Sequence, residues 1–179
     1  MAAKATILKA ELQVTDLDRH YYASHALTLA QHPSETDTRL LVRLLAFALH
    51  ADERLEFGRG LSDEDEPALW RRDYTGAIEQ WIELGQPDEA RLRKASGRAQ
   101  QVVVVSYGGQ AAEAWWKRNA AALTRLRNLS VIELDDAGVD ARDRPLSVGP
   151  GPAFIAADMN GRAALPAGHG IRWHHQVTF

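Results

Sequence analysis

The sequence contains no cysteine, which excludes disulfides, thiolate metal sites and cysteine nucleophiles. It has no apolar run near the roughly 20 residues of a membrane-spanning helix, and its first residues form no apolar signal segment. It has no excess of one charge either, because 21 Lys and Arg oppose 24 Asp and Glu, a net charge of −3. No global field therefore attracts it to nucleic acid or an anionic membrane, and any polyanion site must be local. We expect a soluble cytoplasmic protein without a membrane partner.

The remaining composition is that of an ordinary globular protein. With 179 residues, 45% of them hydrophobic, the chain is long enough for one domain, and we expect it to span residues 1–179. Alternation of apolar and polar residues from Leu8 to Val14 predicts a half-buried strand. The segment 33–37 then predicts a helix start capped by Ser34, with the helix running to about His50 and lying against a sheet.

A β-hairpin is predicted around the Thr-Gly dipeptide at 75–76, between two segments rich in β-forming residues. With that dipeptide as the loop, Trp70 lies opposite Trp81, an aromatic pair of the kind that cross-strand neighbours prefer. The same register sets Arg72 opposite Glu79, an opposite-charge pair. Two independent pairs thus favour one register.

After the hairpin, helices and strands alternate, which is the order of crossover units on a parallel sheet. The chain ends in a predicted hairpin and a final alternating strand, which we expect to join the N-terminal strand in a second sheet. The fold class is therefore predicted to be α/β, a mixed sheet flanked by helices with an additional antiparallel sheet from the N- and C-terminal strands. The predicted elements are strands at 68–74, 77–84, 101–106 and 129–134, helices at 88–99 and 110–126, a hairpin at 154–165 and a last strand at 171–179.

One stretch combines a carboxylate with several cations. Glu83 lies near the end of a predicted strand, and the helix after it carries Arg91, Lys94 and Arg98 on one face. A carboxylate therefore faces a basic stripe. The simplest interpretation is a salt-bridged strand residue beside a solvated helix surface, which is the commoner role of a charged helix face.

The chain resembles the YaeQ family over nearly its whole length. The resemblance rests on the segments KATILKAEL, LTLAQHPSETDTRLLVRLLAFALHADERLEF, DEPALW, WIELGQPDEARLRKA and LSVIELDD. Members of that family are similar in fold to the PD-(D/E)xK (restriction-endonuclease-like) nucleases, with an added antiparallel sheet. The resemblance thus implies that nuclease-like core, while the family's own activity is not established.

In the PD-(D/E)xK pattern, two carboxylates from adjacent strands hold a divalent metal, Mg²⁺ in type, that activates water, and a lysine follows the second carboxylate by two residues. Glu83 matches the second carboxylate. The lysine position is Gly85, which departs from the pattern, and Lys94 on the following helix is the candidate substitute.

The first carboxylate has two candidates, and the hairpin register decides between them. With the loop at 75–76, Glu66 lies diagonally across from Glu83, within reach of a shared metal. A wider loop centred on Ile78 would instead set Asp73 directly opposite Glu83. The pairing of the two tryptophans favours Glu66.

Two functions follow from these residues. The first is a Mg²⁺-dependent phosphodiesterase or nuclease-like site, with Glu83 and either Glu66 or Asp73 holding the metal and Lys94 assisting the nucleophile. The alternative is a non-catalytic module that binds nucleic acid or an acidic protein through Arg91, Lys94 and Arg98. Because fold does not fix function, the absent in-strand lysine weighs toward the binding module.

Overall fold

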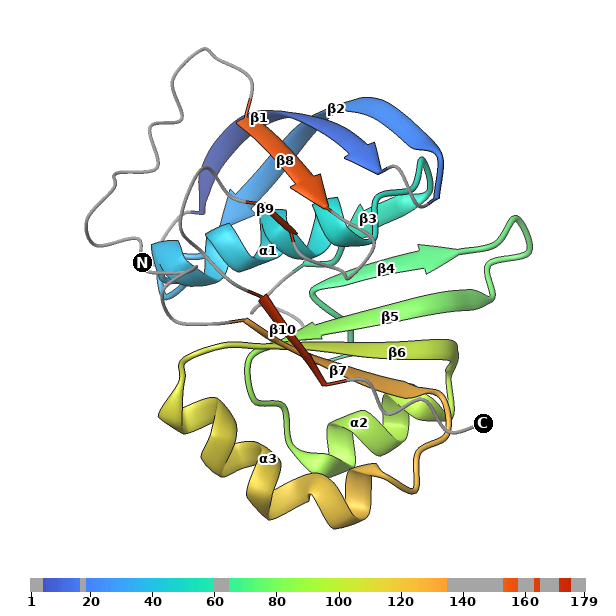
Figure 1. The fold of residues 1–179 in the computed structure, drawn as a ribbon. Helices are drawn as coiled ribbons and strands as arrows, with labels where there is room; N and C mark the ends of the chain where they lie inside the picture. The colour runs from blue at the N-terminus through green and yellow to red at the C-terminus, as the bar shows by residue number, and fades with distance from the viewer. Residues whose placement is uncertain are drawn as a thin grey trace.

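The computed structural model describes residues 5–16, 19–59 and 65–134, together with the backbone of three strands nearer the C-terminus (Figure 1). In chain order the elements are β1 (Thr6–Asp16), β2 (Tyr21–Gln31), α1 (Asp37–Leu49), β3 (Leu55–Phe57), β4 (Leu69–Arg72), β5 (Ile78–Leu84), α2 (Glu89–Ser96), β6 (Ala99–Ser106), α3 (Gln110–Leu123), β7 (Leu129–Leu134), β8 (Ala153–Ala157), β9 (Ala163–Ala164) and β10 (Ile171–His174).

The strands form two sheets. The larger has the order β10-β7-β6-β5-β4-β3, with β5, β6 and β7 parallel and the other pairs antiparallel. The smaller has the order β2-β1-β8-β9, in which β1–β2 and β8–β9 are antiparallel pairs and β1–β8 is a parallel one. The predicted mixed sheet and the separate sheet from both chain ends are confirmed. The last strand, β10, was expected in the smaller sheet and instead pairs with β7.

The sheets and helices stack in layers, with α1 between the two sheets and α2 and α3 on the far face of the larger sheet (Figure 1). The inner core joins Phe47 of α1 to Leu12 of β1 and Ile82 of β5. The outer core joins Leu92 of α2 and Trp115 of α3 to the same sheet. Strand β6 is buried on both faces, as its run of four valines predicts.

The β4–β5 hairpin confirms one predicted pair and overturns the other. Trp70 pairs with Trp81, and their rings meet edge to face with centroids 6.2 Å apart. Arg72, however, pairs with Ile78, so its predicted pairing with Glu79 is wrong.

The physical reason is the length of the loop. Asp73 N donates to Ala77 O, which closes a three-residue loop in which Gly76 has φ +89°. That loop is one residue longer than predicted, and a register shift beyond Arg71 absorbs the difference by skipping Glu79. The carboxylate of the skipped residue, Glu79, instead pairs with Arg71, with 2.9 Å between Arg71 Nε and Glu79 Oε2.

Three helix boundaries also differ from the predictions, one of them the end of α3, which lies at Leu123 instead of residue 126. The N-cap of α1 is Thr36, whose hydroxyl accepts from Arg39 N at 3.2 Å, whereas Ser34 hydrogen-bonds His32. The helix α2 begins after Asp88 as predicted, but it ends at Ser96 instead of reaching residue 99. The turn that follows lets β6 begin at Ala99.

Candidate functional site

Glu83 is a buried carboxylate on the central strand β5, only 4% exposed. Alternation along the strand sends Ile82 toward α1 and directs Trp81 and Glu83 toward α2. The Oε1 atom of Glu83 accepts from Trp81 Nε1 at 2.7 Å and from Arg91 Nε at 2.8 Å. Burial raises the pKa of Glu83, while the hydrogen bond from Trp81 and the charge of Arg91 oppose that rise.

Arg91 connects Glu83 to two other segments. The N-cap Asp88 accepts from Arg91 N at 2.7 Å and so fixes the first turn of α2. The guanidinium then reaches inward, where Nη2 donates to the main-chain oxygen of Glu66 at 2.7 Å. Arg91 therefore lies beneath the helix, joined to β5 and to the segment before β4, and its side chain is 26% exposed.

The two candidates for the first carboxylate lie in different places. Glu66 is beside Arg91 through its carbonyl, but its carboxylate accepts from Arg59 N at 2.9 Å. Asp73 lies in the hairpin loop, where Oδ1 accepts from the backbone of Thr75 and Ala77. The register that set Asp73 opposite Glu83 is therefore wrong, because the strands pair with Trp70 opposite Trp81.

Lys94 and Arg98 meet at Asp65 rather than at Glu83. Lys94 Nζ contacts the Asp65 carboxylate, and this hydrogen bond, with the lysine charge, lowers the pKa of Asp65. Arg98 follows the end of α2, donates to Asp65 O at 3.4 Å and lies over the Trp81 ring at 5.3 Å. The structure thus brings Glu83, Arg91, Lys94 and Arg98 into one region, linked through residues 65–66.

The backbone explains why no lysine follows Glu83 in the strand. Gly85 has φ +83°, a left-handed conformation that side-chain-bearing residues rarely adopt. A Cβ there would lie 3.7 Å from the Tyr107 ring. The position where the nuclease pattern has its lysine is a glycine turn here.

The arrangement around Glu83 does not fit a resident Mg²⁺ ion. Mg²⁺ takes oxygen ligands in near-octahedral geometry, usually with carboxylates. Within the described part of the chain, no three His, Asp or Glu side chains are placed to hold a metal. The carboxylate of Glu83 instead has the cationic guanidinium of Arg91 beside it.

The segregation of charge along the chain extends well beyond the basic stripe of Arg91, Lys94 and Arg98 that the sequence predictions include. Residues 86–128, which contain α2, β6 and α3, hold eight Lys and Arg against three Asp and Glu, a net charge of +5. The rest of the chain has a net charge of −8. Counting charge by segment rather than over the whole chain identifies residues 86–128 as the positively charged part of the protein.

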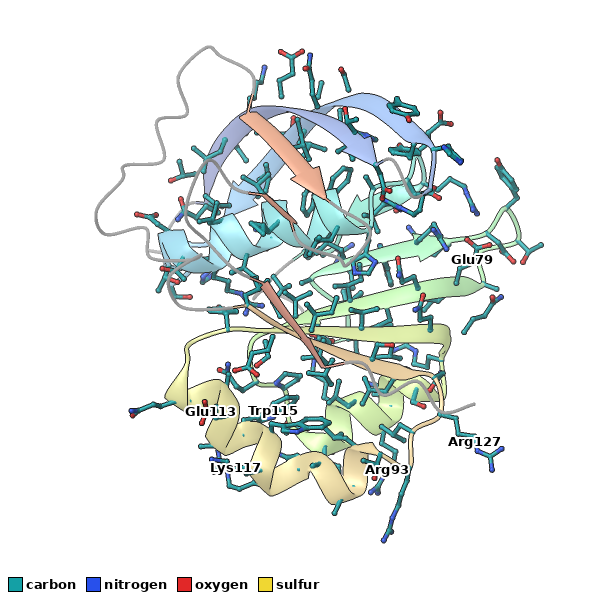
Figure 2. The ribbon with its side chains drawn as sticks, viewed as in Figure 1. Glu79, Arg93, Glu113, Trp115, Lys117 and Arg127 are labelled. Carbon is teal, nitrogen blue, oxygen red and sulfur yellow. The ribbon has the colours of Figure 1, made fainter. Side chains whose placement is uncertain are left out.

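The cations of this segment point outward. Figure 2 shows Arg93, Lys117 and Arg127 extending from α2, from α3 and from the segment after α3. Lys117 pairs with Glu113 at 3.6 Å in an exposed i,i+4 contact. Seven of the eight cations are exposed, and we call these seven the basic layer: Arg93, Lys94, Arg98, Lys117, Arg118, Arg125 and Arg127.

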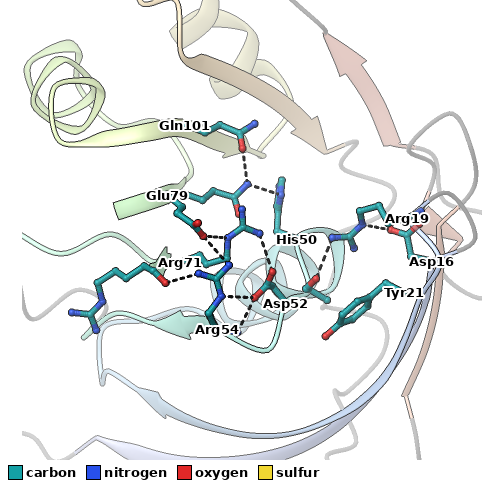
Figure 3. Close-up of polar contacts among 12 residues, drawn as sticks. Asp16, Arg19, Tyr21, His50, Asp52, Arg54, Arg71, Glu79 and Gln101 are labelled. Atoms are coloured by element: carbon teal, nitrogen blue, oxygen red, sulfur yellow. Dashed lines mark hydrogen bonds and ion pairs between the residues drawn. The ribbon is translucent and has the colours of Figure 1, made fainter. Parts of the chain in front are cut away.

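A second polar cluster lies at the end of α1, and hydrogen bonds and ion pairs connect its residues (Figure 3). Gln80 Nε2 hydrogen-bonds His50 Nδ1 and Gln101 Oε1, both at 3.1 Å. Arg71 bridges Asp52 and Glu79 beside them.

Burial, together with the charges of Arg19 and Arg71, lowers the pKa of His50 to about 4. His50 is therefore neutral at physiological pH. We assign this cluster a structural role, since its contacts hold the end of α1 against β4 and β5.

These features define a mixed α/β protein with one helix between two sheets and a basic outer layer of helices. The family model described as YaeQ protein matches residues 1–146, and the chain belongs to the YaeQ family. "Uncharacterized protein YaeQ" from Salmonella typhi is 52% identical over 136 residues, which cover 76% of this chain and 75% of that protein. The protein of the same name from Escherichia coli (strain K12) is 50% identical over 136 residues, which cover 76% of this chain and 75% of that protein.

Two solved structures share the fold. The crystal structure of YaeQ protein from Xanthomonas axonopodis pv. citri has 56% identity and a TM-score of 0.84, covering 93% of this chain and 94% of that one. The structure of YaeQ protein from Pseudomonas syringae has 35% identity and a TM-score of 0.80, covering 94% and 95%. Among the described residues, no helix is long and apolar enough to span a membrane.

Proposed function

We propose that this chain is a non-catalytic module that binds nucleic acid through the basic layer on α2, on α3 and on the segments that follow these helices. The observation that carries the proposal is the charge segregation, +5 over residues 86–128 against −8 elsewhere. A polyanion is attracted to one face of such a molecule and repelled by the rest, which orients it on approach.

The contacts of the basic layer leave its cations available to phosphates. Exposed ion pairs such as Lys117–Glu113 contribute about 0–1 kcal/mol, so a phosphate can displace the carboxylate at little cost. Arg118, Arg125 and Arg127 form no ion pair with a carboxylate within the described residues. Nucleic acid fits better than an acidic protein because the cations are spread over two helices and the segments that follow them, as a repeating phosphate backbone requires.

This proposal changes the set of residues predicted from the sequence. Lys94 and Arg98 stay in the binding surface. Arg91 becomes a positioning residue, because its guanidinium is bonded to Glu83 and to the Glu66 carbonyl. The five other cations of the basic layer complete the surface.

A second candidate function is Mg²⁺-dependent phosphodiester hydrolysis with Glu83, Glu66 or Asp73, and Lys94. One observation favours it: Glu83 is a buried carboxyl with a raised pKa next to the basic layer, and perturbed groups of this kind gather at active sites. Against it, Glu66 and Asp73 direct their carboxylates elsewhere. We therefore place it second.

The test measures binding of fluorescently labelled 20-nucleotide DNA and RNA, single- and double-stranded, by anisotropy at low salt. We expect the double variant Arg125→Ala/Arg127→Ala to bind at least fivefold more weakly than the wild type. The matched control is Lys9→Ala/Arg59→Ala, which removes two exposed cations from outside residues 86–128 and should bind like the wild type.

Two results would overturn the proposal: no binding of any probe at 50 mM salt, or equal losses in both double variants. Binding of a poly-glutamate peptide with the affinity of the nucleic acids would replace nucleic acid with an acidic protein as partner. The same probes incubated with Mg²⁺ test hydrolysis, for which cleavage by the wild type and none by Glu83→Gln is the positive result.

A further inference from the structure

Strand β2 is an edge of the smaller sheet, and along its 11 residues it pairs with β1 only, within the described part of the chain. Figure 1 shows it at the outer border of that sheet. An edge strand presents a row of backbone N–H and C=O groups that can pair with a further strand. A strand of this length is therefore a template for sheet extension.

β2 lacks the features that usually protect such an edge. Its sequence, YYASHALTLAQ, has no Lys, Arg, Asp, Glu, Pro or Gly. Its one titratable group besides the tyrosines is His25, whose pKa is lowered by burial, so the strand is uncharged at neutral pH. By contrast, the paired strand β1 carries Lys9 and Glu11, and the edge strand β3 of the larger sheet is three residues long and carries Glu56.

The side chains on the exposed face of β2 leave room for a second strand to pair beside it. Its exposed positions after Tyr22 are all small residues, whereas Leu27 and Leu29 face inward. One edge carbonyl is already used, because Arg43 Nη1 donates to Ala30 O at 3.2 Å. The stretch open to pairing is therefore the N-terminal and middle part of the strand. The small exposed residues are Ser24, Ala26, Thr28 and Ala30.

We propose that β2 pairs antiparallel with β2 of a second copy of this chain about a two-fold axis. Two four-stranded sheets would then become one continuous sheet of eight strands. The absence of charge argues for a second copy as the partner: identical uncharged strands meet without like charges in opposition, and small residues face small residues. A charged partner segment would find no complementary charge along β2.

The absence of cysteine allows a direct test by cross-linking. Single cysteines at Ser24, Ala26 and Thr28 scan the register, and directly opposed positions bring Cβ atoms about 4.5–5.5 Å apart, close to disulfide distance. We expect at least one of the three to form disulfide-linked dimers under mild oxidation. The control is Ala121→Cys, at an exposed position on α3, which should remain largely monomeric.

Light scattering on the unmodified protein provides the second measurement. We expect a mass of twice 19.8 kDa at micromolar concentration, and a shift to the monomer mass in Ala26→Lys with the circular dichroism of the wild type. If Ala26→Lys fails to fold, Thr28→Lys serves in its place. A monomeric wild type, or a dimer that no β2 cysteine cross-links above the Ala121→Cys control, would overturn the proposal.

Discussion

Arg91 Nε donates to Glu83 Oε1 over 2.8 Å, which joins α2 to the central strand β5. The Glu83 side chain of this pair is buried, with only 5% of its surface exposed. Removing one partner of such a pair leaves a charge without compensation in a poorly solvated place, which costs more than the pair itself contributes. The first prediction tests whether Arg91 has this structural role.

We expect Arg91→Ala to lower the free energy of unfolding by about 2–4 kcal/mol, somewhat less than for a fully buried pair because the arginine is partly exposed. Arg93→Ala, on the exposed face of the same helix, should change it by at most about 0.5 kcal/mol. Urea unfolding followed by circular dichroism measures both. Equal small effects would contradict a role for Arg91 in positioning Glu83.

The start of α1 supports a second prediction. Thr36 is the N-cap, with its hydroxyl accepting from Arg39 N, whereas Ser34 hydrogen-bonds His32 before the helix. Thr36→Ala should therefore lower the free energy of unfolding by about 1 kcal/mol, the usual cost of losing a cap. Ser34→Ala is the matched control and should have a smaller effect. A larger loss of stability in Ser34→Ala than in Thr36→Ala would show that Ser34 caps the helix instead.

The sequence predicted most of the fold because its strongest patterns depend on burial. Four consecutive valines indicate a strand covered on both faces, and β6 is such a strand. The alternation at Leu8 to Val14 lies within β1, which extends it at both ends. Strand β2 was missed because small residues such as Ala23 and Ala26 weaken the contrast between its two faces.

The site was harder to predict, because it depends on single residues. One extra residue in the hairpin loop moved Arg72 from Glu79 to Ile78, and no propensity distinguishes the two loops. The ion pair of Glu83 with Arg91 agrees with the predicted salt-bridged strand residue facing a basic stripe. The hydrogen bond that the Glu66 carboxylate accepts from Arg59 N depends on tertiary contacts and was not predicted. Side-chain direction across segments is set by packing, which local patterns do not encode.

His50 supports a prediction on pH. Its folded pKa is about 4 against an ordinary value of 6.5, with burial as the main cause. Between these values the unfolded chain binds a proton that the folded chain does not, so stability is complete above pH 6.5 and falls as the pH drops to 4. The loss of stability is about 3 kcal/mol over that window.

The measurement is urea unfolding from pH 7.5 to 4.0, with NMR titration of the His50 ring as an independent reading of its pKa. His50→Gln keeps a polar group beside Gln80 and cannot titrate, so its stability should depend less on pH than that of the wild type. A His50 ring that titrates near 6.5 in the folded protein would contradict the prediction.

Salt dependence distinguishes phosphate contacts from other modes of binding. Each phosphate that a Lys or Arg neutralises releases condensed counterions, so log Kobs falls with log salt by about 0.9 per contact on duplex DNA. If four of the seven cations of the basic layer contact phosphates, the slope should be about −3.6. Arg125→Ala/Arg127→Ala should reduce its magnitude by about 1.8, while Lys9→Ala/Arg59→Ala leaves it unchanged. Anisotropy titrations between 50 and 200 mM salt measure the slope, and a slope near zero with tight binding would show that phosphates are not the ligand.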